Sequence, residues 1–116
     1  MQLTLNHFLV LGAVLFCIGL YGAITKRNAI AVLMGIEIML NAVNITMVGF
    51  SFFNHVTNAH APNGFGAYAT YLTGQIFAIF IITVAAAEAA VALAMIIAIY
   101  RKRDTVDVGE IDMMKW

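Results

Sequence analysis

Residues 29–53 read AIAVLMGIEIMLNAVNITMVGFSFF, an apolar run whose only charged side chain is Glu37. An α-helix needs about 20 predominantly apolar residues to cross the ~30 Å hydrocarbon core of a bilayer, and this run is longer. The run therefore predicts a transmembrane helix. A carboxyl group in the middle of such a helix is costly and is seldom without a role, so Glu37 is a candidate functional residue.

Two other apolar runs flank this one along the chain. Residues 3–24 contain no charged side chain, and residues 71–100 again contain a single one, Glu88. Residues 54–70 hold the only proline, Pro62, together with glycines and asparagines that are typical of a loop. We therefore predict an all-α membrane protein with three transmembrane helices at 3–24, 29–53 and 71–100, forming a single membrane domain over residues 1–116.

The composition points to the same class. Hydrophobic residues make up 63% of the 116 residues and charged residues 10%, whereas a soluble domain is about 45–50% apolar. A soluble catalytic module is therefore excluded. The single cysteine, Cys17, cannot form an internal disulfide, and His55 and His60 lack the cysteine or acidic neighbours of a metal site. We expect no metal and no cofactor in this chain.

The basic residues predict the orientation in the membrane. Lys26 and Arg27 follow the first apolar run and Arg101–Arg103 follow the third, whereas residues 54–70 contain no charge. Because basic loop residues stay on the cytoplasmic side, we predict an outside N-terminus, an outside loop at 54–70 and a cytoplasmic tail at 101–116. Within this tail, residues 104–116 alternate acidic and apolar residues, which is typical of a segment lying against a neighbouring protein or the membrane surface.

The two glutamates are predicted to lie at similar depths. Glu37 is ten residues, or ~15 Å, from Arg27, and Glu88 is thirteen residues, or ~20 Å, from Arg101. Both positions fall near the middle of the bilayer. We expect both carboxyl groups to face other helices or water, because an isolated carboxylate facing lipid is unfavourable.

Polar and small residues surround the two acids. Glu37, Asn41 and Asn44 are spaced i, i+4 and i+7, which puts an acid and two amides on one helix face. Alanines surround Glu88 at residues 85–92 and would let another helix approach closely. One interpretation is a pair of proton-carrying acids with a supporting polar face. The alternative is that these side chains only hydrogen-bond neighbouring helices and hold an assembly together.

Several short motifs resemble one known family. They are LFCIGLYG at 15–22, TKRN at 25–28, GIEIMLNAVN at 35–44, AAAEAA at 85–90 and YRKRDTV at 100–106. Together they resemble the K subunit of bacterial respiratory complex I, which is also the NdhE subunit of its photosynthetic relatives. The resemblance covers essentially the whole chain. One departure is the segment 54–70, which is longer than the connection usual in this family.

The resemblance implies a non-redox subunit in the membrane arm of a proton-pumping NADH-quinone oxidoreductase, between the J-type and N-type subunits. Glu37 and Glu88 would then belong to the hydrophilic axis that links quinone reduction to proton translocation. The loop of Lys26, Arg27 and Asn28 would be functionally sensitive. Quinone, flavin and iron-sulfur centres would be bound by other subunits, and the membrane would be the bacterial inner membrane or, as an alternative, a thylakoid.

Other membrane proteins also use buried glutamates. The C-type subunit of multisubunit cation/proton antiporters is similar in size, but it generally lacks an acid at the position matching Glu37. A small multidrug transporter needs four spans, and the rotor subunit of an ATP synthase is a two-helix hairpin with one acid. A purely structural assembly subunit is the remaining alternative, and glutamate-to-glutamine variants distinguish it from a proton carrier.

Overall fold

The computed structural model describes residues 3–58 and 64–111, which form three long helices in one flat layer. The helices are α1 (Leu5–Thr25), α2 (Ala29–Asn58) and α3 (Gly64–Arg103), and a short 3-10 helix, η1 (Val108–Glu110), follows them. All three long helices contain spans apolar enough to cross a membrane. The predicted all-α fold with three transmembrane helices is therefore confirmed.

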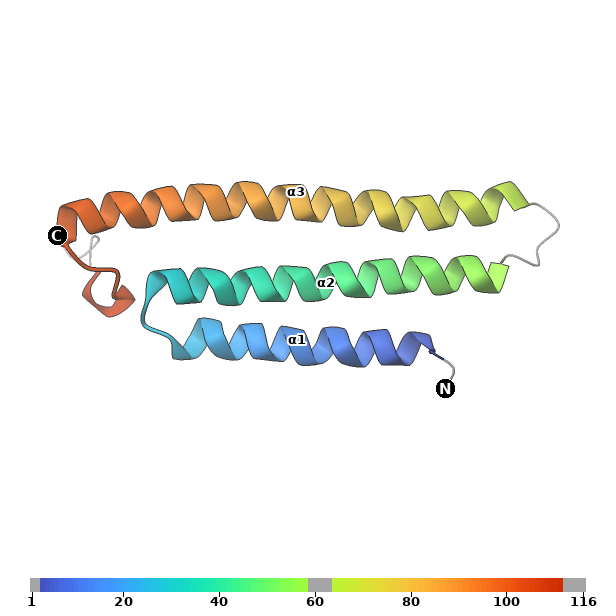
Figure 1. The fold of residues 1–116 in the computed structure, drawn as a ribbon, viewed down its shortest axis with the longest axis horizontal. Helices are drawn as coiled ribbons and strands as arrows, with labels where there is room; N and C mark the ends of the chain where they lie inside the picture. Colours follow the sequence, from blue (N-terminus) through green and yellow to red (C-terminus); the bar gives the residue numbers. More distant parts are fainter. Residues whose placement is uncertain (1–2, 59–63, 112–116) are drawn as a thin grey trace.

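The central helix of the layer is α2, and α1 and α3 pack on either side of it (Figure 1). Neighbouring helices run antiparallel, so the start of α1 and the α2–α3 connection lie at one end of the layer. The α1–α2 loop and the end of α3 lie at the other end. The molecule measures 65 × 27 × 21 Å, so its long axis is about twice the ~30 Å thickness of a hydrocarbon core.

Most of the segment 54–70, which was predicted to be a loop, is helical. Residues 54–58 continue α2, and residues 64–70 are already part of α3, while 59–63, including His60 and Pro62, lie outside the described residues. The two helices remain close at this level, because Asn54 and Ala69 line one hollow. Helix propensity is a weak signal, so asparagines and glycines did not reliably indicate the helix ends.

Glycines bring α1 and α2 into close contact. A Cβ atom on Gly19 would lie 2.6 Å from the carbonyl oxygen of Gly35, and one on Gly35 would lie 2.8 Å from the amide nitrogen of Ala23. Only a residue without a side chain allows the two backbones to approach this closely, as at many membrane helix contacts. This close contact fixes how α2, with Glu37, lies against α1.

A serine–glycine contact sets the register between α2 and α3. Gly74 lies so close to Ser51 that an added Cβ atom would overlap the serine side chain. Further along α3, the buried Ala78 and Ala85 continue the contact with α2 at heptad spacing. Small residues at this spacing are typical of closely packed membrane helices.

The chain after α3 folds back onto the α1–α2 loop. Asp104 adopts a left-handed conformation with φ of 54°, which turns the chain at the end of α3. The amide of Ala29 then donates to the carbonyl of Val106 at 2.9 Å, and the amide of Val108 donates to the carbonyl of Arg27 at 2.8 Å. We call residues 104–108 the C-terminal strap. The sequence pattern favoured a tail that lies against a neighbouring protein or the membrane surface. The described part of the tail instead lies against the α1–α2 loop of the same chain.

Candidate functional site

Glu37 and Glu88 lie at the same level along the layer. Glu37 lies 14 residues before Ser51 on α2, and Glu88 lies 14 residues after Gly74 on α3. Ser51 and Gly74 are in contact. Because α2 and α3 are antiparallel and rise equally per residue, the two glutamates lie opposite each other across the α2–α3 contact. The register therefore brings two acids that are far apart in the sequence to one depth.

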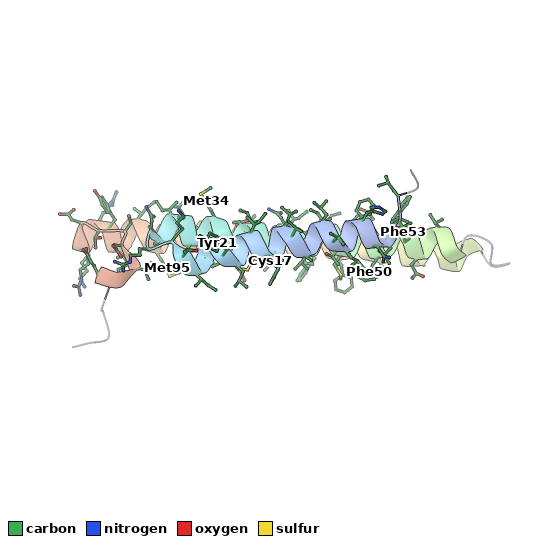
Figure 2. All side chains as sticks on the ribbon, turned by 90° about the horizontal axis from the view of Figure 1, so that it is seen from below. Cys17, Tyr21, Met34, Phe50, Phe53 and Met95 are labelled. Carbon is green, nitrogen blue, oxygen red and sulfur yellow. The ribbon has the colours of Figure 1, made fainter. Side chains whose placement is uncertain are left out.

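The two carboxyl groups nevertheless open toward different faces of the layer. Met34 points to one face, and Phe50 and Met95 point to the opposite one (Figure 2). Glu88 lines a shallow hollow of about 400 Å³ together with Met95 and is itself exposed. We call these the Met34 face and the Met95 face, and Glu88 opens on the Met95 face.

Glu37 lies on the other side of the α2–α3 contact. It comes three residues after Met34 and four before Asn41, positions that neighbour one another on a helix surface. Asn41 follows Met34 by two turns and therefore lies on the Met34 face, where it is exposed. Glu37 itself is half-buried between that face and α3. The two acids thus lie at one level along the layer but toward different faces of it.

Neither glutamate forms an ion pair with a basic side chain of the described residues. Lys26, Arg27 and Arg101–Arg103 all gather at one end of the layer, beside the α1–α2 loop (Figure 1). A carboxylate at mid-membrane depth needs polar partners or water. The basic side chains of the described residues do not supply such a partner to Glu37 or Glu88.

The predicted polar face contains one exposed and one buried amide side chain. Asn41 is exposed, whereas Asn44 is only 8% exposed. The Oδ1 atom of Asn44 is buried and has no hydrogen-bond partner among residues 3–58 and 64–111. The two amides therefore meet different surroundings, although their spacing relative to Glu37 is as the sequence analysis described.

Hydrogen bonds hold the backbone around the basic loop. Lys26 and Arg27 are exposed, while the Asn28 side chain accepts a hydrogen bond from the amide of Ile30 at 2.9 Å and so caps the start of α2. Asn28 also pairs with Asp107 in an isolated antiparallel bridge. The C-terminal strap therefore holds the loop backbone and leaves its two cations open to contact with partners.

The strap is a feature that the sequence analysis missed. Its local signal is a cluster of turn-forming side chains after the basic residues: Thr105 Oγ1 accepts from the amide of Asp107, and Asp107 Oδ1 accepts from the amide of Gly109 at 2.8 Å. Such Ser/Thr and Asp bonds to nearby amides indicate ordered turns. The hydrogen-bond partners of the strap in the α1–α2 loop, however, depend on tertiary contacts.

The fold and the site together define a protein with three helices able to span a membrane, two of which each carry one acid within the apolar span. In the most apolar 18-residue stretch of each span, only 11%, 17% and 11% of the residues are buried. The family model described as NADH-ubiquinone/plastoquinone oxidoreductase chain 4L matches residues 7–116, and the chain belongs to this family.

Relatives match over nearly the whole chain. The NAD(P)H-quinone oxidoreductase subunit 4L of Nostoc sp. is 51% identical over 114 residues, covering 98% of this chain and 100% of the relative. The NADH-quinone oxidoreductase subunit K of Geobacillus sp. is 55% identical over 114 residues, covering 98% of this chain and 97% of the relative. That of Brevibacillus brevis is 50% identical over 115 residues, covering 99% of each chain. The resemblance to the K subunit family is confirmed, and other subunits of such a complex are the partners that family membership implies.

Proposed function

We propose that this chain is a non-redox subunit of the membrane arm of a proton-translocating NAD(P)H- or ferredoxin-quinone oxidoreductase, and that Glu37 and Glu88 carry protons within it. The observation that carries the proposal is the pairing of two mid-depth acids at one level on neighbouring helices. Ionisable residues at such depths are typical of proton relays. The acid at Glu37 and the names of the relatives favour this function over an antiporter subunit.

In this account the two acids serve different neighbours. Glu88 opens on the Met95 face and Glu37 lies toward the Met34 face, so a J-type subunit on one face and an N-type subunit on the other could each contact one acid. A proton passing between the acids needs water or polar groups around the α2–α3 contact. The exposed Asn41 is one such group beside Glu37.

The remaining assignments follow from the same role. Quinone, flavin and iron-sulfur centres are bound by other subunits, and this chain contributes no catalytic redox residue. The end carrying Lys26, Arg27 and Arg101–Arg103 faces the cytoplasm, in agreement with the positive-inside rule. The membrane is the inner membrane of a bacterium, or a thylakoid in a photosynthetic one.

A glutamine variant of Glu88 tests the proposal. Glu88→Gln keeps the size of the side chain and removes its exchangeable carboxyl proton, so donor-driven proton pumping is expected to fall by roughly tenfold or more while the complex still assembles. Glu110→Gln, outside the apolar spans, is the matched control and is expected to pump normally. Normal pumping by Glu88→Gln would leave only a packing role for this acid.

A further inference from the structure

A further hollow lies beside Asn44, between the three helices. It has a volume of about 600 Å³ and an almost wholly apolar lining, to which α1 contributes Phe8, α2 contributes Val48 and Phe52, and α3 contributes Ile82. Ile45 also lines it and follows Met34 by eleven residues, about three turns, so the hollow opens on the Met34 face. It therefore differs from the hollow at Glu88.

One side chain that lines this apolar hollow carries a buried polar atom without a hydrogen-bond partner in the described chain. Asn44 lines the hollow, is more than nine-tenths buried, and its Oδ1 atom accepts no hydrogen bond within the described chain. Leaving a buried amide oxygen unpaired costs about 1–3 kcal/mol, so buried polar groups almost always have partners. The hollow is thus complementary to a group that brings both apolar surface and a hydrogen-bond donor.

The helices around the hollow are arranged like a groove. α1 and α3 pack on opposite sides of α2 (Figure 1), and the hollow is lined by residues of all three helices. Although α2 is the central helix, only 17% of the residues in the most apolar 18-residue stretch of its span are buried. An apolar groove along a central helix, flanked by two parallel helices, has the shape that accepts one further helix.

We propose that this groove is the docking site for a transmembrane helix of another subunit of the complex, and that a serine or threonine hydroxyl on that helix hydrogen-bonds Asn44. A hydroxyl both donates and accepts, so it satisfies the amide whichever of its two polar ends faces the groove. A lipid chain offers no hydrogen bond, and a water molecule needs two to four polar partners where the hollow supplies almost none but Asn44 and Gln75. This inference concerns assembly and is independent of proton transfer by Glu37 and Glu88.

Photo-crosslinking in the intact complex identifies the occupant. A benzophenone amino acid at Ile82, which lines the groove and is 53% exposed, is expected to form an adduct with one apolar peptide containing serine or threonine. The matched control position is Ile76, which is 64% exposed and lies two and a half turns from the buried Ala85, on the side of α3 away from α2. The control is expected to give a different adduct. Lipid adducts alone at Ile82 would overturn the proposal.

Substitutions in the same groove test the hydrogen bond. Asn44→Leu removes the polar group but keeps an apolar side chain of similar size. If a partner hydroxyl is present it loses its acceptor, and the fraction of complex that survives detergent extraction should fall roughly three- to tenfold. If no partner is present, removing an unpaired buried amide should leave that fraction unchanged or raise it, which would contradict the proposal.

A second variant keeps the test independent of how well Asn44→Leu folds. Ile82→Trp fills the groove from an exposed position and is expected to lower the retention of the docked subunit, whereas Ile76→Trp on the opposite side of α3 should retain it. Equal retention of every subunit in the two tryptophan variants would overturn the proposal, provided that both chains reach wild-type levels in the membrane.

Discussion

Gly74 of α3 lies against the side chain of Ser51 of α2, closely enough that a Cβ atom on the glycine would overlap both the Cβ and Oγ atoms of the serine. This contact fixes the antiparallel register of the two helices. Since Glu37 and Glu88 are equally far from it along their own helices, the contact also fixes the shared depth of the two acids. A substitution here should therefore affect both packing and the alignment of the acids.

Gly74→Ala is predicted to destabilise the subunit. Overpacking costs about 1–3 kcal/mol, which exceeds the gain of up to about 1 kcal/mol that alanine brings to a helix interior. Gly22→Ala is the matched control, because the nearest atom to its added Cβ lies 3.9 Å away. Membranes should contain less assembled complex with Gly74→Ala and normal amounts with Gly22→Ala.

A double variant separates the contact from other effects of Gly74→Ala. Adding Ser51→Gly removes the side chain that the new Cβ atom would meet, so the double variant should recover most of the lost complex. Such a cycle measures the coupling between two residues in contact. If Ser51→Gly gives no recovery, the register does not depend on this contact.

The C-terminal strap depends on the left-handed turn at Asp104. A β-branched residue is strained at φ of 54° whereas glycine is not, so Asp104→Val is predicted to loosen the strap and Asp104→Gly to retain it. Hydrogen exchange at the amides of Ala29 and Val108, which bond across the strap, should be faster in the valine variant. The expected cost of the valine is about 1–2 kcal/mol. Equal exchange in the two variants would show that the turn does not hold the strap.

The orientation of the layer is predicted from its basic end. After Cys17→Ala, a cysteine at Thr105 should react with a membrane-impermeant maleimide only from the cytoplasmic side. A cysteine at Val56, which is exposed at the other end of the layer, should react only from the opposite side. Labelling of Thr105→Cys from outside would reverse the predicted orientation.

Composition was sufficient to predict the three apolar helices, because hydropathy and length identify segments that can cross a bilayer. The depth of Glu37 and Glu88 in the membrane stays a prediction from the rise per residue. Composition did not predict where α2 ends. Asn58 and Gly64 belong to helices although both lie beyond the apolar spans. Hydropathy reports the membrane boundary and not the end of a helix.

The arrangement of faces also required the structure. The spacing of Glu37, Asn41 and Asn44 placed them together on α2, but it could not indicate that Glu88 opens on the opposite face or that Asn44 is closed in beside α3. Those relations depend on how α2 and α3 are rotated against each other. The Ser51–Gly74 contact shows that rotation, and no pattern within one helix contains it.

The most direct test of the central claim is the number of protons moved per quinone reduced in assembled complexes carrying Glu37→Gln, with Glu37→Asp as the control that keeps a carboxyl group. We predict that Glu37→Gln lowers both pumping and coupled quinone reduction by roughly tenfold or more, and that Glu37→Asp retains a substantial part of both. A Glu37→Gln complex that assembles and pumps as well as the unaltered complex would contradict the proposed role of Glu37 in proton transfer.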